Sequence, residues 1–511
     1  MLDDGLCGKT ASDQADLEAK IRRSYSEFPS FTSEEKRRAL TLLRDVHVRY
    51  LSKNLGPLPS GYLSLDASRT WLVFWIVHSL ALLDAPLPPK PSRTAIIEFL
   101  DRCQHPTGGF GGGPHQLPHL ASTYAAVASL VTLGGSDALG IVRRKDMFEF
   151  LKRMCVDPSK GGGLTVHDGG EVDVRGCYTA MATAHLLGLD KAEIAERCGM
   201  VAFIKRCQSH EGGLGGEPGN EAHGGYAFCG VGALALLGKV DVLDLPKLLH
   251  WLVNMQGPME GGFKGRCNKL VDGCYSYWQG ATFPIIHSTL SKQNSGLPCE
   301  NLSLTDEDLP DVPELPPLGC DGPVVQARVH EKKKLQALSM ELGLDMDDLE
   351  SEGADGDELE EGSKSDKMAT FHEALGSSQR KIGATEASVS GVLLDAIADA
   401  PPHYPLVSSI PDAEPEDPSV NGSVLYDALA LQFWLLKSCQ ARGGGLRDKP
   451  GKPPDLYHTC YCLSGLSIAQ HYSGKVLGPP ENTLVKPDPV LNIVETRLKE
   501  AEAFFSNQEM V

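Results

Sequence analysis

Apolar residues occur along the chain in short stretches with helical spacing, and a polar residue opens each stretch. Thr32 and Glu35 have the spacing of a capping box, and an apolar face that continues to Tyr50 follows them. Residues 66–75 repeat the arrangement, with Asp and Ser before an apolar run that contains two tryptophans. The pattern predicts a chain built from helices, with residues 1–31 as a polar, loosely held N-terminal extension.

A longer repeat begins near residue 100. A predicted helix ends at Cys or Met followed by Gln, and a pair of glycines with one apolar residue comes next. The full copies are Cys103-Gln104 with Gly108-Gly109-Phe110, Cys207-Gln208 with Gly212-Gly213-Leu214, Met255-Gln256 with Gly261-Gly262-Phe263, and Cys439-Gln440 with Gly444-Gly445-Leu446; a degenerate copy is Gly162-Gly163-Leu164. In chain order and counting the degenerate copy, the first four glycine turns recur about every fifty residues. This period is typical of stacked helical pairs. Because about 180 residues separate the last two, we infer an insertion of about 130 residues in a regular array.

The charge distribution marks the same insertion. The net charge is −19, and residues 291–420 contain about 28 Asp and Glu against about 9 Lys and Arg, which accounts for the whole excess. This segment is rich in Pro, Ser and Gly, and residues 355–362 offer almost nothing to bury. We expect a solvated, disordered insertion without chemistry, the alternative being a docking or regulatory segment. The one hint of a binding element is a possible helical face formed by Leu335, Leu338, Leu342 and Leu349.

After each glycine turn comes a second helix, rich in small residues, that opens with polar or aromatic groups. The openings are Tyr124-Ala125-Ala126, Arg175-Gly176-Cys177-Tyr178, His223-Gly224-Gly225-Tyr226, Asp272-Gly273-Cys274-Tyr275 and Tyr457-His458-Thr459-Cys460. Small residues allow close packing, so we expect these helices to form an inner ring with the first helix of each pair outside. If they run parallel, their N-terminal ends meet at one rim, where free backbone N–H groups and helix dipoles favour anions.

Side chains at this rim would add to the anion site. The donors His223, Arg266, Lys269 and Tyr275 are enough for a diphosphate. Below them, an apolar wall suited to a long hydrocarbon would be formed by Trp71, Trp75, Tyr178, Tyr226 and Trp278.

Asp272 and Cys274 form a candidate metal site. A thiolate and a carboxylate two residues apart can bind one borderline metal such as zinc, but a tetrahedral site needs at least one more ligand. His458 is the candidate for that ligand.

Composition excludes several classes of protein. No apolar run approaches the roughly 20 residues of a membrane helix, and the first residues lack a secretory signal. The 14 cysteines include no Cys-x2-Cys pair, which is typical of reduced thiols in the cytosol. Residues 508–511 contain no lipidation cysteine. We therefore expect a soluble, cytoplasmic protein without a lipid anchor and without a nucleic-acid partner.

Three motifs carry a family resemblance. Residues 223–230, 267–276 and 457–466 resemble the β subunit of protein farnesyltransferase, and the likeness extends over about residues 40–290 and 420–475. The resemblance implies an all-α fold, an α/α barrel (toroid) with one zinc ion, and a separate helical α subunit that completes a heterodimer. The barrel would comprise residues 32–290 and 421–475, interrupted by the acidic insertion at 291–420 and followed by a C-terminal tail at 476–511.

The resemblance also implies roles for individual residues. Asp272, Cys274 and His458 would bind zinc, which would hold a substrate cysteine as thiolate. His223, Arg266, Lys269 and Tyr275 would bind the diphosphate and stabilise the charge that develops as it leaves. The isoprenoid pocket would be lined by Trp71, Arg175, Tyr178, Tyr226, Cys229 and Trp278. The residues near the bound peptide would be Trp75, His119, Ala121, Tyr457 and Tyr461. The implied reaction transfers farnesyl from farnesyl diphosphate to the cysteine of proteins that end in Cys-a-a-X.

Two positions bear on the length of the prenyl group. Trp71 resembles the bulky residue that shortens the pocket in the farnesyl enzyme. Asp448 matches a carboxylate associated with magnesium, whereas the geranylgeranyl relative has a lysine in that role. Both favour farnesyl over the alternative, the β subunit of geranylgeranyltransferase type I.

Two further alternatives are weaker. Residues 345–348 match the Asp-x-Asp-Asp acid of terpene cyclases, but they lie in the acidic insertion, and we interpret the match as chance. A zinc-stabilised scaffold without activity would not need Arg266, Lys269 and His223 at one rim.

Overall fold

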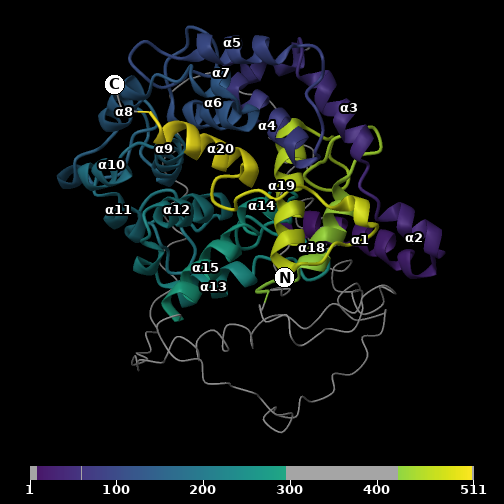
Figure 1. The fold of residues 1–511 in the computed structure, drawn as a ribbon. Coiled ribbons are helices and arrows are strands. Elements are labelled where there is room, and N and C mark those ends of the chain that lie inside the picture. Colours follow the sequence, from purple (N-terminus) through teal and green to yellow (C-terminus); the bar gives the residue numbers. More distant parts are fainter. Residues whose placement is uncertain (1–7, 59, 295–423, 509–511) are drawn as a thin grey trace, which may run out of the picture. The chain divides into compact units, whose positions relative to one another are not determined.

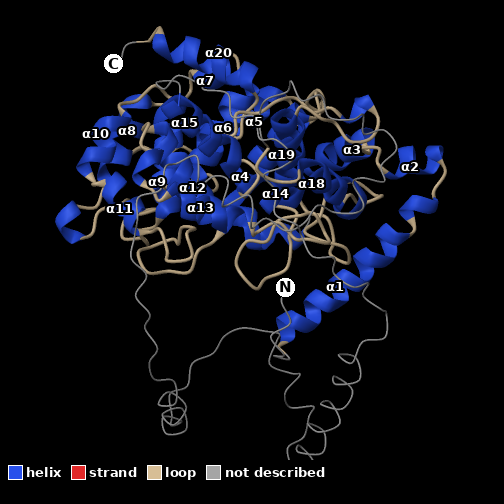
Figure 2. Ribbon diagram, turned by 90° about the horizontal axis from the view of Figure 1, so that it is seen from below, coloured by secondary structure: helices blue, strands red, loops and turns tan. Residues whose placement is uncertain are grey.

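The computed structural model describes residues 8–58, 60–294 and 424–508, and within these ranges the regular structure is helical (Figures 1 and 2). The extended pairs in the described parts are isolated bridges. The chain divides into two compact units, residues 1–297 with 387–511, and residues 298–386. The description below concerns the first unit. The acidic insertion, apart from residues 291–294, lies outside the described residues, as do its leucine pattern and residues 345–348.

Six helical segments form a closed inner ring (Figure 1). Each segment contacts the next, and the last contacts the first. In order around the ring they are α4 (Arg69–Leu82), α6 (Leu120–Leu133), α9 (Val174–Leu186), α12 (Gly224–Leu236), α14 (Tyr275–Trp278) continued by α15 (Thr282–Asn294), and α19 (Leu456–Ser473). Nearly every residue of α6 is buried, and its small residues, such as Ala125, Ala126 and Ala128, permit this close packing. The predicted all-α toroid with an inner ring is confirmed.

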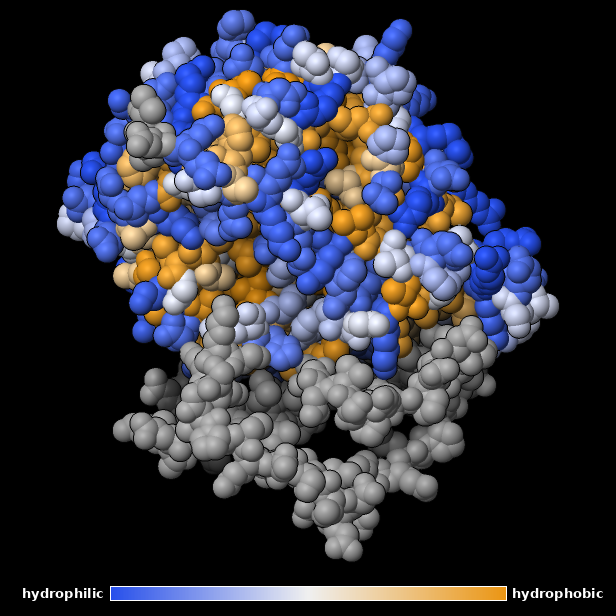
Figure 3. All heavy atoms as spheres, viewed as in Figure 1, coloured by the Kyte–Doolittle hydropathy of each residue, from blue (hydrophilic) through white to orange (hydrophobic). Residues whose placement is uncertain are grey.

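An outer helix precedes each inner one. The outer helices are α3 (Arg44–Asn54), α5 (Arg93–Cys103), α8 (Arg144–Arg153), α10 (Lys191–Arg197) with α11 (Met200–Arg206), α13 (Leu245–Val253), and α18 (Ala428–Trp434), which a π-helical turn at Leu435–Cys439 extends. These helices are amphipathic: α8 buries Met147, Phe148, Phe150 and Leu151, while its charged residues are exposed or half-buried. In the space-filling view, polar side chains cover much of the periphery while apolar side chains show nearer the centre (Figure 3).

The glutamine of the repeat joins successive outer helices. In four copies its side-chain oxygen accepts a hydrogen bond from the backbone N–H at the N-cap of the next outer helix. These bonds are Arg143 N to Gln104 (2.9 Å), Asp244 N to Gln208 (2.9 Å), Asp427 N to Gln256 (3.0 Å) and Leu43 N to Gln440 (2.8 Å). The last of them closes the ring from the final repeat to the first. The neighbouring glycines allow close contact: a Cβ on Gly108, whose φ is +87°, would lie 2.0 Å from the carbonyl oxygen of Asp146.

The N-terminal region differs from the expectation. The capping box at Thr32 and Glu35 is confirmed, but it opens a short α2 (Ser33–Ala39), and α3 begins separately. The expectation of a loosely held extension is wrong for α1 (Lys9–Ser26). This helix buries Leu17 and Tyr25, and the Tyr25 hydroxyl donates to the carbonyl of Glu260 (3.0 Å). Leu17, Ile21 and Tyr25 lie four residues apart on one face of the helix, and this short apolar face packs a largely polar segment against the rest of the unit.

The C-terminal region also differs from the tail expected at residues 476–511. Tyrosine hydroxyls of the inner ring donate to consecutive carbonyls of residues 489–491, at distances of 3.1 Å for Tyr277, 2.7 Å for Tyr178 and 2.8 Å for Tyr124. Beyond this segment, α20 (Glu495–Ser506) packs against α6, the short α7 (Ser136–Leu139) and α9. Residues 484–506 are therefore part of the toroid. Among the described residues, none of the helices combines the length and apolar character of a membrane span.

Candidate metal centre and prenyl site

Backbone hydrogen bonds place the inner helix starts at one rim. At the start of five of the six inner segments, one backbone N–H is accepted by a carbonyl in the turn of the next repeat. The pairs are Thr70 to Gly112 (3.3 Å), Leu120 to Val166 (2.7 Å), Val174 to Gly216 (3.0 Å), Gly224 to Gly265 (2.8 Å) and Gly273 to Asp448 (2.7 Å). The inner helices are therefore parallel, which meets the condition stated for a common rim. The expectation that these N–H groups are free for an anion is wrong, because the neighbouring repeat occupies them.

At five helix starts, a backbone N–H is occupied by a capping side chain. The capping residues and their donors are His119 with Ala121, Asp173 with Arg175, His223 with Gly225, Asp272 with Cys274, and Asp455 with His458. Side-chain caps of this kind satisfy groups that the helix leaves unpaired. Capping is thus the local reason why Asp and His side chains lie at this rim.

Asp272, Cys274 and His458 lie together at the rim. One donor atom from each residue lies within 4.8 Å of the other two, and His458 Nε2 is 3.3 Å from Asp272 Oδ1. Gly273 makes this approach possible, because a Cβ there would lie 2.6 Å from the sulfur of Cys462. Sulfur, carboxylate oxygen and imidazole nitrogen in this arrangement fit a zinc ion with one position left open.

Asp455 orients the imidazole of His458. Its Oδ2 lies 2.6 Å from His458 Nδ1, while its Oδ1 accepts the backbone N–H of the same residue (2.7 Å). Nε2 therefore faces Asp272. Burial opposes charge on both groups, but their mutual hydrogen bond prevails: it lowers the pKa of Asp272 to about 2 and, with Asp455, raises the pKa of His458 to about 10. Burial also raises the pKa of the Cys274 thiol well above its ordinary value, and Asp272 adds to the effect.

Two of the candidate diphosphate ligands touch each other. The Tyr275 hydroxyl lies 2.9 Å from His223 Nε2, whose other ring nitrogen caps α12. Burial and the nearby Arg266 lower the pKa of His223. Arg266 forms an ion pair with Glu221 (2.9 Å), and Lys269 is exposed in the same turn.

Below the rim, aromatic rings from the inner helices form a closed chain of contacts. The ring-centroid distances are 5.7 Å for Trp71–Tyr124, 5.5 Å for Tyr124–Tyr178, 5.2 Å for Tyr178–Phe228, 5.2 Å for Phe228–Trp278, 4.3 Å for Trp278–Tyr461, 4.8 Å for Tyr461–Tyr457, 5.5 Å for Tyr457–Trp75 and 5.8 Å for Trp75–Trp71. All six inner segments contribute a ring, and the α14–α15 segment does so through Trp278 of α14. Such a wall suits an unsaturated hydrocarbon chain.

The comparisons with known proteins agree with this geometry. Residues 42–493 match the family model of the prenyltransferase alpha-alpha toroid domain. The chain is 36% identical to the protein farnesyltransferase subunit beta of Pisum sativum, over 94% of this chain and 98% of that protein. It is also 36% identical to the subunit of the same name from Arabidopsis thaliana, over 94% of this chain and 86% of that protein. The chain belongs to the family of protein farnesyltransferase β subunits.

A solved structure supports the same fold. The Candida albicans protein geranylgeranyltransferase-I, complexed with GGPP, superposes with a TM-score of 0.54 at 17% identity, covering 90% of this chain and 98% of that one. The chain is thus a prenyltransferase toroid in fold as well as in sequence.

The remaining predicted positions of this prenyltransferase lie on the same helices. Arg175 forms ion pairs with Asp173 (2.5 Å) and Glu171 (3.5 Å), and its guanidinium lies over the ring of Tyr226 at 5.7 Å. Cys229 is buried one turn below Tyr226. Arg175 is therefore a rim residue, and its hydrogen bond to Asp173 raises its pKa further.

The candidate peptide residues divide into two groups. Trp75, Tyr457 and Tyr461 are members of the aromatic chain, and the Tyr457 hydroxyl accepts a hydrogen bond from Trp278 Nε1 (3.0 Å). His119 caps α6 through the N–H of Ala121, and its ring lies 5.5 Å from that of His167.

Asp448 is engaged by Lys449 through both carboxylate oxygens. Burial and the charge of Asp272 raise the pKa of Asp448. A cation at Asp448 would therefore share this carboxylate with Lys449.

Four residues of the candidate site were not predicted in a functional role. Tyr124 and Phe228 are members of the aromatic chain, and the ring of Tyr277 contacts those of Phe228 and Tyr461. In the sequence, nothing distinguishes these three residues from ordinary core residues. Asp455 had a detectable signal, because an Asp three residues before a ligand candidate at a helix start can cap and orient it.

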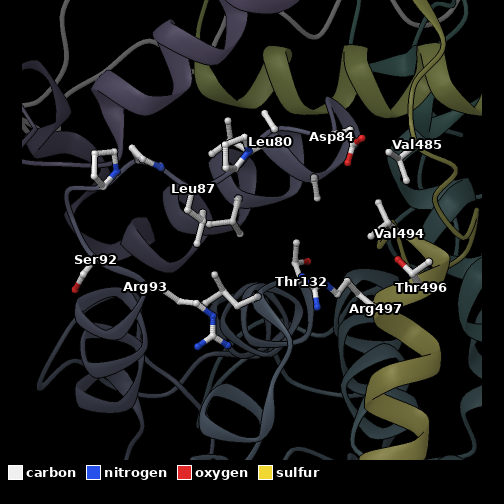
Figure 4. A pocket seen from close by; sticks show the side chains of 17 residues that line it. Leu80, Asp84, Leu87, Ser92, Arg93, Thr132, Val485, Val494, Thr496 and Arg497 are labelled. Carbon is white, nitrogen blue, oxygen red and sulfur yellow. The ribbon is translucent and has the colours of Figure 1, made fainter.

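A separate groove lies toward the other end of the inner helices (Figure 4). Its volume is about 840 Å³, and its walls come from the C-terminal halves of α4 and α6, residues 84–93 and the segment near Val485 and Val494. Its two arginines are occupied, Arg93 by Asp137 and Arg497 by Glu500. Trp71 and Trp75 lie in the opposite half of α4, so this groove is distinct from the closed aromatic chain.

Proposed function

We propose that this chain is the catalytic β subunit of a zinc-dependent protein farnesyltransferase. The observation that carries the proposal is the meeting of Asp272, Cys274 and His458 at the rim directly above the closed aromatic chain. The relatives' name, protein farnesyltransferase subunit beta, supports the same activity. The substrates would be farnesyl diphosphate and proteins that end in Cys-a-a-X.

The three ligands would hold one zinc ion and leave a position for the cysteine of the substrate protein. Bound zinc would supply a thiolate at neutral pH. The chain's own contribution is geometric. Asp455 keeps His458 Nε2 directed at Asp272, and Gly273 lets Cys274 approach.

The diphosphate would be bound by side chains, because the first backbone N–H groups of the rim are already occupied. The Tyr275 hydroxyl would donate to the leaving oxygen, and the cations Arg266 and Lys269 would balance its charge. His223 positions the Tyr275 hydroxyl. Asp448 would bring magnesium to the diphosphate, since Mg²⁺ commonly takes one protein carboxylate together with phosphate oxygens.

The hydrocarbon would lie against the aromatic chain, with Tyr178, Tyr226, Cys229, Trp278 and Arg175 around it. Trp71 contacts both Tyr124 and Trp75, so it fills space that a longer chain would need. This supports farnesyl over geranylgeranyl. The alternative, a geranylgeranyltransferase type I β subunit, would require that Trp71 move. The peptide would contact Trp75, His119, Ala121, Tyr457 and Tyr461.

We further propose that the chain acts in the cytoplasm with a separate α subunit, as a heterodimer. The proposal is tested by co-expressing the chain with a farnesyltransferase α subunit. Bound zinc and transfer of farnesyl or geranylgeranyl to a Cys-a-a-X peptide are then measured. Cys274→Ala should lose both zinc and transfer. Cys267→Ala, in the same loop but outside the ligand set, is the matched control and should retain them.

Transfer from geranylgeranyl diphosphate alone would favour the alternative. Absence of zinc from the wild-type complex would contradict the metal site.

A further inference from the structure

Five joints of the outer ring follow a copy of the glycine-turn repeat, and one of these five differs from the other four. At four joints the repeat places a glutamine that bonds to the start of the next outer helix. At the joint after α8 the corresponding residue is Cys155, which pairs with Leu164 as Gln104 pairs with Phe110. The side-chain amide is therefore replaced by a thiol at a position where two outer helices meet.

A second cysteine faces Cys155 at this joint. Cys198 lies between α10 and α11, and the two thiols interact: Cys198 lowers the pKa of the Cys155 thiol, whereas Cys155 and burial raise the pKa of the Cys198 thiol. Both sulfurs also contact the carbonyl oxygen of Ile194, at 3.7 Å for Cys155 and 3.2 Å for Cys198.

Backbone hydrogen bonds hold the segments that carry the two cysteines together. Gly163 donates to the carbonyl of Cys198 (2.9 Å), and its own carbonyl accepts from Val156 (2.9 Å). Gly162 permits the approach, since a Cβ there would lie 2.6 Å from the carbonyl oxygen of Cys198. The same glycine turn thus contacts the chain next to Cys155 on one side and Cys198 itself on the other.

We propose that Cys155 and Cys198 form a reversible disulfide across this joint when the protein meets a two-electron oxidant such as hydrogen peroxide. Cys155 is partly exposed and Cys198 is fully buried, so the oxidant reaches Cys155 first. Both thiols are free in this structure. The proposal is independent of the proposed function, since neither residue lies at the rim or in the aromatic chain.

The reaction balances in two steps. The Cys155 thiolate attacks one peroxide oxygen, the O–O bond breaks, and the departing hydroxide takes a proton to form water, which leaves a sulfenic acid. The Cys198 sulfur then attacks the sulfenic sulfur, the S–O bond breaks, and hydroxide leaves with the thiol proton as a second water. Contact with Cys198 lowers the pKa of the Cys155 thiol and Arg197 lowers it further, which favours Cys155 as the first nucleophile. Excess thiol reverses the disulfide by exchange.

The chain contains an internal control pair. Burial and the neighbouring Cys439 raise the pKa of the Cys462 thiol, and both residues are fully buried. If exposure of one thiol decides which pair reacts, peroxide should link Cys155 to Cys198 and leave Cys439 and Cys462 reduced.

The test treats the full-length chain, in its complex, with a limited dose of hydrogen peroxide, blocks free thiols and digests with trypsin without reduction. Cleavage after Arg and Lys yields residues 154–160 with Cys155 as the single cysteine and residues 198–205 with Cys198 as the single cysteine. The expected product is these two peptides linked, with the loss of two hydrogens. Thiol treatment of the oxidised protein should abolish it.

Cys155→Gln is the informative variant, because it restores the residue used at the other joints and so preserves folding. It should show no linked peptide, and peroxide should leave its Tm unchanged while raising the Tm of the wild type. The proposal is overturned if Cys155 is trapped as a sulfenic acid without linkage to Cys198. It is equally overturned if Cys439 and Cys462 oxidise as readily.

Discussion

Asp455 offers the sharpest test of how the metal site is built. One carboxylate oxygen caps α19 by accepting the His458 N–H, and the other lies 2.6 Å from His458 Nδ1. Asp455→Asn separates these roles. The remaining oxygen can still cap the helix, because Asn caps about as well as Asp. The new NH2 group cannot accept the Nδ1 proton, so the imidazole loses the partner that directs Nε2 toward Asp272.

Loss of such an orienting partner lowers metal affinity by roughly 10- to 100-fold. This corresponds to about 1.4–2.7 kcal/mol of binding free energy. The free energy of unfolding should change little in Asp455→Asn, whereas Asp455→Ala, which also lacks the cap, should lose about 1 kcal/mol. The two variants therefore separate metal orientation from helix stability.

The assay is a zinc titration of the complex against a chromophoric chelator, together with farnesyl transfer at limiting and saturating zinc. Transfer should fall at limiting zinc and recover largely at saturation. Asp190→Asn is the matched control, because Asp190 caps α10 on the outer ring through the N–H groups of Ala192 and Glu193. If Asp455→Asn binds zinc within about twofold of the wild type, the orienting role is refuted.

Three further outcomes follow from the geometry. Replacing Trp71 by Thr should admit geranylgeranyl diphosphate, measured as a rise in its kcat/KM relative to that of farnesyl diphosphate; continued rejection would show that pocket length is set elsewhere. Tyr275→Phe should lower kcat by roughly 10- to 100-fold at nearly constant KM for farnesyl diphosphate, because the hydroxyl acts on charge that develops in the transition state; an effect on KM alone would contradict this. Burial lowers the pKa of His78 from 6.5 to about 4, so below pH 6.5 the unfolded chain binds a proton that the folded chain excludes. The free energy of unfolding should therefore fall by up to roughly 3 kcal/mol between pH 6.5 and 4, and His78→Gln should flatten this slope in urea titrations; an unchanged slope would assign it to other groups.

The meeting of the three candidate metal ligands could be predicted because their signal is local. Asp272 and Cys274 are two residues apart, and His458 stands at the same place in its own repeat, at the start of an inner helix. A repeat architecture turns equal positions in sequence into equal positions in space. The family resemblance led to the same residues.

The occupied N–H groups at the rim could not be predicted. The acceptor of each bond, such as Val166 for Leu120, belongs to the next repeat, and its carbonyl direction depends on the turn between them. When a helix is considered alone, its first backbone N–H groups have no acceptor within the helix. The docked α1 and the segment at residues 489–491 were missed for a related reason. Each segment has few buried residues, and their role depends on contacts with distant parts of the chain. Tyr25, for example, donates a hydrogen bond to the carbonyl of Glu260.

The connection between α15 and α18 shows why a long insertion leaves the site intact. Gln256 bonds to the backbone of Asp427 through both its amide oxygen (3.0 Å) and its amide nitrogen (2.9 Å), which joins the two sides of the insertion. In addition, α14 contacts α19, the helix that carries His458. Lengthening even a fully flexible loop from about 10 to about 130 residues costs only about 2 kcal/mol in closure entropy. Because contacts within the ring fix the distance between Asp272 and His458, the length of the connection does not enter the geometry of the metal site.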